Sequence, residues 1–124
     1  MNDSANLPVT MAVDTKKYGI RIHKALFRQL GEPRYIQLLV NPDEGVVAIQ
    51  TVEKEMSGGQ THRIIEKRML SENSYEIYSR SFVRKLRELE PGIEEGGAYR
   101  LTGSIIPSRK IAVFPLRTLQ RTDR

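Results

Sequence analysis

The feature that most constrains the fold of this chain is an internal repeat. Four short matches occur in the same order in its two halves: Tyr18 and Ile20 with Tyr75 and Ile77 at an offset of 57 residues, Leu26–Leu30 with Phe82–Leu86 at 56, and both Tyr35 with Tyr99 and Val47–Ile49 with Ile111–Val113 at 64. Matches in a fixed order indicate a duplicated unit. One strand, one short helix and one hairpin cannot bury their apolar sides alone, so we expect the two copies to pack together about a pseudo-twofold axis.

The spacing of apolar residues predicts the elements of each copy. It predicts strands over 9–13, 18–22, 35–40 and 46–52 and a helix over 23–30 in the first copy, and strands over 62–69, 75–78, 98–106 and 110–116 and a helix over 80–90 in the second. The strand over 9–13 is expected at an edge of the sheet. The later helix has the clearest pattern, since Phe82, Val83 and Leu86 share one side.

We expect a single domain over 1–124, of the α+β class and dominated by strands, in which two strand–helix–hairpin pseudo-repeats form a barrel. Its parts are a disordered N-terminus (1–8), a first pseudo-repeat (9–54), a linker (55–61), a second pseudo-repeat (62–116) and a basic, mobile tail (117–124). A Ser-Gly-Gly run marks the linker. A chain of 124 residues can bury roughly two thirds of its unfolded surface in one core.

The composition excludes several classes of protein. There is no cysteine, which excludes disulfides, thiolate metal sites and thiol catalysis. No run approaches the ~18 apolar residues of a membrane span, and the N-terminus lacks the pattern of a signal peptide. We therefore expect a cytoplasmic protein with no membrane partner.

The net charge of +5 is confined to the second half of the chain. Residues 1–61 carry seven basic and seven acidic residues, whereas residues 62–124 carry thirteen and eight. One-sided positive charge is typical of a protein that meets a polyphosphate or an acidic partner.

Basic residues gather around the two predicted helices. The candidate nucleic-acid-binding residues are Arg21, Lys24, Arg28, Arg80, Arg84, Lys85 and Arg87. In a pseudo-symmetric fold the two clusters are expected to form one continuous basic face that contacts phosphates. The alternative is that they are solvated helix surfaces, with Arg84 paired to Glu88 one turn further on.

No catalytic, cofactor or metal site is evident in the sequence. His23 and His62 have no acidic or histidine neighbour at metal-ligand spacing. Ser79 and Ser81 lack a visible base, so we expect one of them to cap the helix that follows rather than to act as a nucleophile. The sequence therefore predicts a protein that is not an enzyme and that uses no cofactor.

The stretch from Ile22 to Gly31 resembles the AbrB-like (SpoVT/AbrB) DNA-binding unit. That family's pattern is a strand, then Ile-Pro-Lys-x-Leu-Arg-x-x-Leu-Gly, then a β-hairpin, and it is matched at Ile22, Lys24, Leu26, Leu30 and Gly31. His23 replaces the proline of the pattern, Phe27 replaces its arginine, and Gly19 replaces the basic residue that opens its strand. The resemblance covers 18–50 and extends to 75–116 only through the internal repeat.

The resemblance implies a swapped-hairpin barrel, normally made by two chains and here encoded in tandem, as in MraZ-like and double-psi barrel arrangements. It also implies sequence-tolerant DNA binding and a role as a regulator or antitoxin. Arg28 falls on a DNA-contacting position of the family. In the second copy Arg84 takes the place of Arg28, and Arg80 takes that of Lys24.

We therefore predict a DNA-binding transcriptional regulator with double-stranded DNA as its partner, either a monomeric pseudo-dimer or a homodimer. The alternative is a non-enzymatic protein-interaction module, such as an antitoxin-like partner or an assembly subunit. An enzyme whose site is assembled from loops is a third hypothesis, which a deep polar pocket would support.

Overall fold

The computed structural model describes residues 8–53, 61–63, 69–71 and 74–123. The strands are β1 (Pro8–Asp14), β2 (Gly19–His23), β3 (Tyr35–Asn41), β4 (Val46–Val52), β5 (Thr61–Arg63), β6 (Met69–Ser71), β7 (Ser74–Tyr78), β8 (Ala98–Ile106), β9 (Ile111–Pro115) and β10 (Gln120–Arg121). The helices are α1 (Lys24–Gln29) and α2 (Arg80–Leu89), with 3₁₀ turns at η3 (Pro107–Arg109) and η4 (Leu116–Thr118). The fold is dominated by strands, as the sequence predicts.

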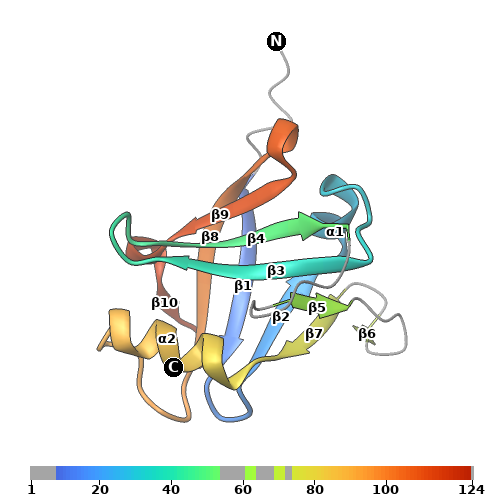
Figure 1. Ribbon diagram of the computed structural model, residues 1–124. Coiled ribbons are helices and arrows are strands. Elements are labelled where there is room, and N and C mark those ends of the chain that lie inside the picture. Colours follow the sequence, from blue (N-terminus) through green and yellow to red (C-terminus); the bar gives the residue numbers. More distant parts are fainter. Residues whose placement is uncertain (1–7, 54–60, 64–68, 72–73, 124) are drawn as a thin grey trace.

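The strands form one antiparallel sheet in the order β5-β3-β4-β9-β8-β1-β2-β7-β6, with β10 added to β8. This sheet is strongly curled into a half-barrel (Figure 1). Gly103 permits a close approach of β8 to β9, because a Cβ atom there would lie 2.0 Å from the carbonyl oxygen of Val113. The curl turns one side of the sheet inward and leaves the other side facing outward (Figure 1).

The inner side of the sheet holds the hydrophobic core. Along β1, β8 and β9 alternate residues are buried in it, as expected for strands with one buried side. Its largest fully buried members are Phe82, Phe114, Met11, Ile20, Ile22, Leu26, Leu30, Ile36, Leu38, Ile49, Leu86 and Leu101. Because these residues come from both halves of the chain, the halves share a single core.

Each helix begins at a side-chain cap. The Ser79 hydroxyl accepts a hydrogen bond from the Phe82 N–H (3.3 Å) at the start of α2, and Nδ1 of His23 accepts one from the Ala25 N–H (3.0 Å) at the start of α1. Gly31, with a φ of 89°, ends α1 in the left-handed conformation that favours glycine. The two helices lie at opposite ends of the half-barrel (Figure 1).

The N-terminal strand does not lie at a sheet edge, so that prediction is wrong. β1 starts at Pro8, inside the predicted disordered segment, and pairs with β2 on one side and with β8 on the other. The sequence shows that Val9, Met11 and Val13 face one way, but such alternation says nothing about which strands lie alongside.

The predicted mobile tail is also wrong. Leu116–Thr118 form η4, Gln120–Arg121 form β10, and β10 pairs with β8. The Thr118 hydroxyl donates to the carbonyl of Thr102 and accepts from its N–H, each at 3.0 Å. Residues 55–60 of the predicted linker lie outside the described residues, and Thr61, its last residue, begins β5. Residues 64–68 of the predicted strand over 62–69 also lie outside the described residues.

Candidate nucleic-acid interface

The pairing of β2 with β7 presents a polar outer surface, which we call the β2–β7 face. Its outward residues lie in register as Gly19 with Tyr78, Arg21 with Glu76, and His23 with Ser74. Arg21 and His23 are exposed, and Tyr78 is 52 % exposed. The face therefore offers a cation, an imidazole and an aromatic ring to a partner.

A helix begins at each end of the β2–β7 face. α1 follows β2 directly, α2 follows β7 after one residue, and the two strands are antiparallel, so the helices start at opposite ends. Residues three or four positions apart lie along one side of a helix. Lys24 and Arg28 therefore form a basic row at one end, and Arg80, Arg84 and Arg87 form one at the other.

The predicted basic residues thus lie in two separate groups rather than on one compact patch. Arg21, Arg28, Arg84 and Lys85 are exposed and form no ion pair with any described residue, and Lys24 is half-buried. No pair between Arg84 and Glu88 forms within the described part of the chain. These residues are therefore available to an anionic partner.

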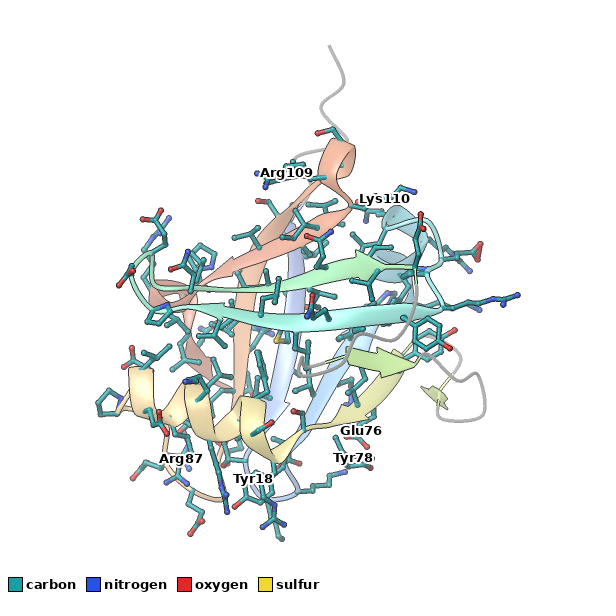
Figure 2. The ribbon with its side chains drawn as sticks, in the orientation of Figure 1. Tyr18, Glu76, Tyr78, Arg87, Arg109 and Lys110 are labelled. Carbon is teal, nitrogen blue, oxygen red and sulfur yellow. The ribbon has the colours of Figure 1, made fainter. Side chains whose placement is uncertain are left out.

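Arg80 and Arg87 are engaged by other groups of the protein. The Arg80 guanidinium lies 4.6 Å from the centre of the Tyr18 ring, a cation–π distance. Arg87 is half-buried, lies 3.8 Å from a carboxylate oxygen of Glu95, and has a buried Nε without a hydrogen-bond partner. Figure 2 shows Tyr18 and Arg87 on the α2 side of the molecule. Arg87 is the least available of the seven predicted residues.

The β2–β7 face contains a buried carboxylate that sequence reasoning missed. Glu76, which lies beside Tyr78 (Figure 2), is 5 % exposed. Its Oε1 accepts a hydrogen bond from the Tyr78 hydroxyl (2.6 Å), and its Oε2 lies 3.7 Å from the Lys17 ammonium. Gly19 makes room for it, because a Cβ there would lie 3.0 Å from Oε2. The one acidic residue of this face is thus buried and paired with Lys17, whereas Arg21 on the same face is exposed.

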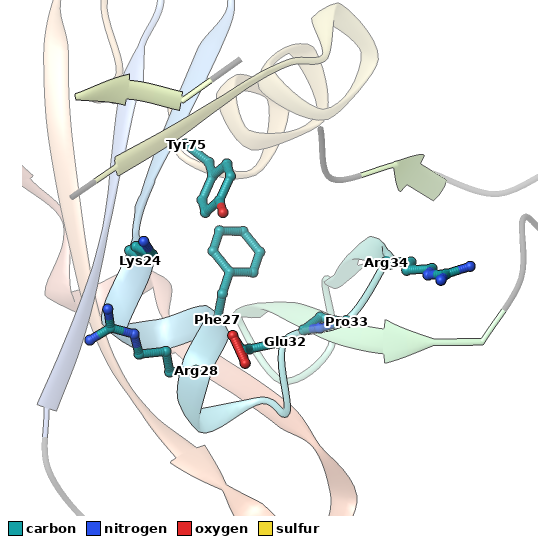
Figure 3. A pocket seen from close by; sticks show the side chains of 7 residues that line it. All are labelled: Lys24, Phe27, Arg28, Glu32, Pro33, Arg34 and Tyr75. Atoms are coloured by element: carbon teal, nitrogen blue, oxygen red, sulfur yellow. The ribbon is translucent and has the colours of Figure 1, made fainter. Parts of the chain in front are cut away.

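A cavity of about 200 Å³ lies beside α1, and we call it the α1 pocket (Figure 3). Its lining consists of three basic residues, one acid and three apolar or aromatic residues: Lys24, Arg28, Arg34, Glu32, Phe27, Pro33 and Tyr75. The Phe27 and Tyr75 rings meet edge-on, with centroids 4.8 Å apart and planes at 84°. The sequence did not reveal this pocket because Tyr75 lies in the other half of the chain.

The turn that follows α1 shapes the rim of the α1 pocket. Glu32 adopts a φ of 53°, directly after Gly31 at 89°, and its N–H donates to the Phe27 carbonyl oxygen at 2.8 Å. A left-handed conformation is unfavourable for a residue other than glycine, and such residues cluster at functional sites. This turn carries Arg34 round to the side of the pocket away from Lys24 (Figure 3).

A second hollow, of about 390 Å³, lies on the outer side of β3, β4 and β9. Its lining is mostly apolar and comprises Leu39, Val40, Asn41, Pro42, Val46, Ala48, Ile111 and Val113. Leu39 is 37 % exposed. No charged side chain lines this hollow, so it differs in chemistry from the α1 pocket.

Other basic residues lie away from the β2–β7 face. Arg109 and Lys110 are exposed at the tip of the β8–β9 hairpin (Figure 2). Arg121 contacts the Glu94 carboxylate and donates from Nε to Asp123 (2.8 Å), a bond that lowers the pKa of Asp123 and raises that of Arg121. Arg121, which belongs to β10, is therefore paired with two carboxylates of the protein itself.

Comparison with protein-family models, curated proteins and solved structures found no match to this chain. Within the described residues, no group of three or more acidic or histidine side chains is placed to hold a metal ion. In the same part of the chain, no helix is long and apolar enough to cross a membrane.

Proposed function

We propose that the protein binds double-stranded DNA as a transcriptional regulator and contacts phosphates across the β2–β7 face. The observation that carries this proposal is that a helix with basic residues begins at each end of the β2–β7 ladder, and that Arg21 is exposed on β2 itself. No ion pair within the described residues neutralises Lys24, Arg28 or Arg84. Basic side chains near a duplex release condensed counterions, which supplies most of sequence-tolerant affinity.

The dimensions of the face suit a duplex. The β2–β7 ladder has five residue pairs, so its ends lie about 14 Å apart at the usual rise of a strand. The major groove of DNA is about 12 Å wide. The ladder that separates the starts of the two helices is therefore comparable in length with the width of one groove.

We further propose that the fold is a swapped-hairpin barrel built from two pseudo-repeats, of the AbrB-like kind. Strand register supports this idea. Ile20 pairs with Ile77, its own match at an offset of 57 residues. In the β4–β9 ladder, Ala48 pairs with Val113 and Ile49 with Ala112, which is the crosswise pattern expected of two strands related by a twofold axis.

Contacts of the helices support the same proposal. Tyr75 of the second half packs on Phe27 of the first, and Tyr18 of the first half packs under Arg80 of the second. Because the two tyrosines match at an offset of 57, each half lends the same residue to the other half's helix. One chain thus supplies both halves of what two chains make in the AbrB-like family.

A titration of a labelled DNA duplex at several salt concentrations tests the proposal. We expect the logarithm of the affinity to fall linearly with the logarithm of the salt concentration, and Arg21→Ala to reduce the slope by about one. Arg117→Ala is the matched control. Arg117 is an exposed arginine like Arg21, but it lies on η4, which packs beside β8 and not on the β2–β7 face. Absence of binding below ~50 mM salt would contradict DNA binding and leave protein interaction as the better explanation.

A further inference from the structure

We propose that the α1 pocket binds a nucleoside monophosphate, a small ligand that joins a phosphate, a ribose and a flat ring. This inference goes beyond DNA binding and does not depend on it. It rests on three kinds of group that the pocket brings together: cations, a carboxylate acceptor and aromatic rings. Each kind matches one part of such a ligand.

The cations of the pocket supply the charge that a phosphate needs, with Lys24 and Arg28 on one side and Arg34 on the other (Figure 3). Lys24, Arg28 and Arg34 outnumber the single acid, Glu32, and none of the three forms an ion pair with a described residue. A phosphomonoester carries about −1.5 to −2 charges at pH 7, which balances a net lining charge of that size. Arginine also offers a planar pair of donors that fits phosphate oxygens.

The aromatic wall matches the base. Phe27 is buried, whereas Tyr75 is half-buried and meets it edge-on, so part of the Tyr75 ring remains open to the pocket (Figure 3). Nucleobases stack on such rings irrespective of sequence. A cavity of about 200 Å³ is smaller than sites that enclose a drug-sized molecule, so it holds one part of a nucleotide while the rest lies along its rim.

The remaining charged group matches the ribose. A carboxylate only accepts hydrogen bonds, and the hydroxyls of a ribose donate them. Glu32 stands at the rim, held by the left-handed turn and by the hydrogen bond from its N–H to the Phe27 carbonyl. The left-handed turn thus places a hydrogen-bond acceptor beside Phe27 in the lining of the pocket (Figure 3).

Calorimetric titration of the full chain tests this site. The ligands are adenosine monophosphate, adenosine and inorganic phosphate, each at ~50 mM salt so that screening stays weak. We expect saturable binding of the monophosphate and at least about tenfold weaker binding of the other two, because each lacks one half of the interaction. Phosphate that binds as tightly as the monophosphate, or no saturable binding at all, would overturn the proposal.

Two variants separate this proposal from DNA binding. Arg34→Ala should weaken monophosphate binding about tenfold and leave DNA binding unchanged, and Arg84→Ala should do the reverse. Tyr75→Leu should remove the preference for the monophosphate over phosphate, and circular dichroism checks that this variant folds. Should Tyr75→Leu not fold, the binding measured for Arg34→Ala alone tests the site. Equal monophosphate affinities for the Arg34→Ala and Arg84→Ala variants would refute the site.

Discussion

The two helices occupy matching positions of the repeat that we propose, but the tyrosine that packs against each is used differently. At α1, Tyr75 meets the edge-on ring of Phe27 and borders an open cavity. At α2, the guanidinium of Arg80 lies over Tyr18 at 4.6 Å and covers it. One framework therefore supports an open aromatic pocket at one end and a cation-covered ring at the other. A few side-chain differences are enough to give two ends of one fold different chemistry.

The largest expected effect tests whether both ends belong to one core. Leu30 and Leu86 match at an offset of 56 and are 1 % and 0 % exposed. Leu30→Ala and Leu86→Ala should each lower the free energy of unfolding by about 2–5 kcal/mol, the cost of emptying a buried leucine site. Denaturant unfolding measures both. Wild-type stability for either variant would show that its helix is not part of the shared core.

The next effect compares the phosphate contacts of the two ends. Arg28→Ala and Arg84→Ala should each weaken DNA binding by about 1–2 kcal/mol, since each removes one charge-assisted contact. Both side chains are exposed, so stability should change by less than about 0.5 kcal/mol. Paired titrations and melting curves measure the two quantities. A loss confined to one variant would place DNA at one end only.

The caps of the two helices give a smaller effect. Ser79→Ala and His23→Ala each remove the acceptor for the N–H of Phe82 or of Ala25. Each should cost about 0.5–2 kcal/mol of stability, the usual value for a lost helix cap. Thermal unfolding with glycine variants as controls measures it, because glycine restores most of a cap's value. An alanine variant as stable as the wild type would mean that its helix begins without help from the side chain.

The smallest effect concerns the covered ring. Arg80→Ala removes the cation from Tyr18 and should lower stability by about 0.5–1 kcal/mol, as for an exposed cation–π pair. Arg80→Lys keeps the charge but loses the planar stacking, so its loss should be smaller. Chemical denaturation measures the free energy of unfolding of the two variants. A larger loss for lysine than for alanine would show that stacking on Tyr18 does not hold Arg80.

The sequence predicts the elements well because apolar periodicity records which residues face the core. The α2 helix and the hairpins at 35–52 and 98–116 follow from such patterns and from turn residues. Apolar periodicity does not show which strands lie beside one another in a sheet, so the central position of β1 could not be predicted from it. The α1 pocket and buried Glu76 were missed for a related reason: each depends on contacts between residues distant in sequence, such as Phe27 with Tyr75.

The placement of β1 has a consequence for synthesis on the ribosome. β1 (Pro8–Asp14) is translated early, but β8, one of the strands it pairs with, is translated only after α2. β4 likewise has no partner on one side until β9 has been translated. The nascent chain therefore carries unsatisfied backbone donors and acceptors until its last hairpin appears, and such edges recruit foreign strands. A stalled or truncated product ending before residue 98 should accordingly aggregate or be degraded rather than persist as half a protein.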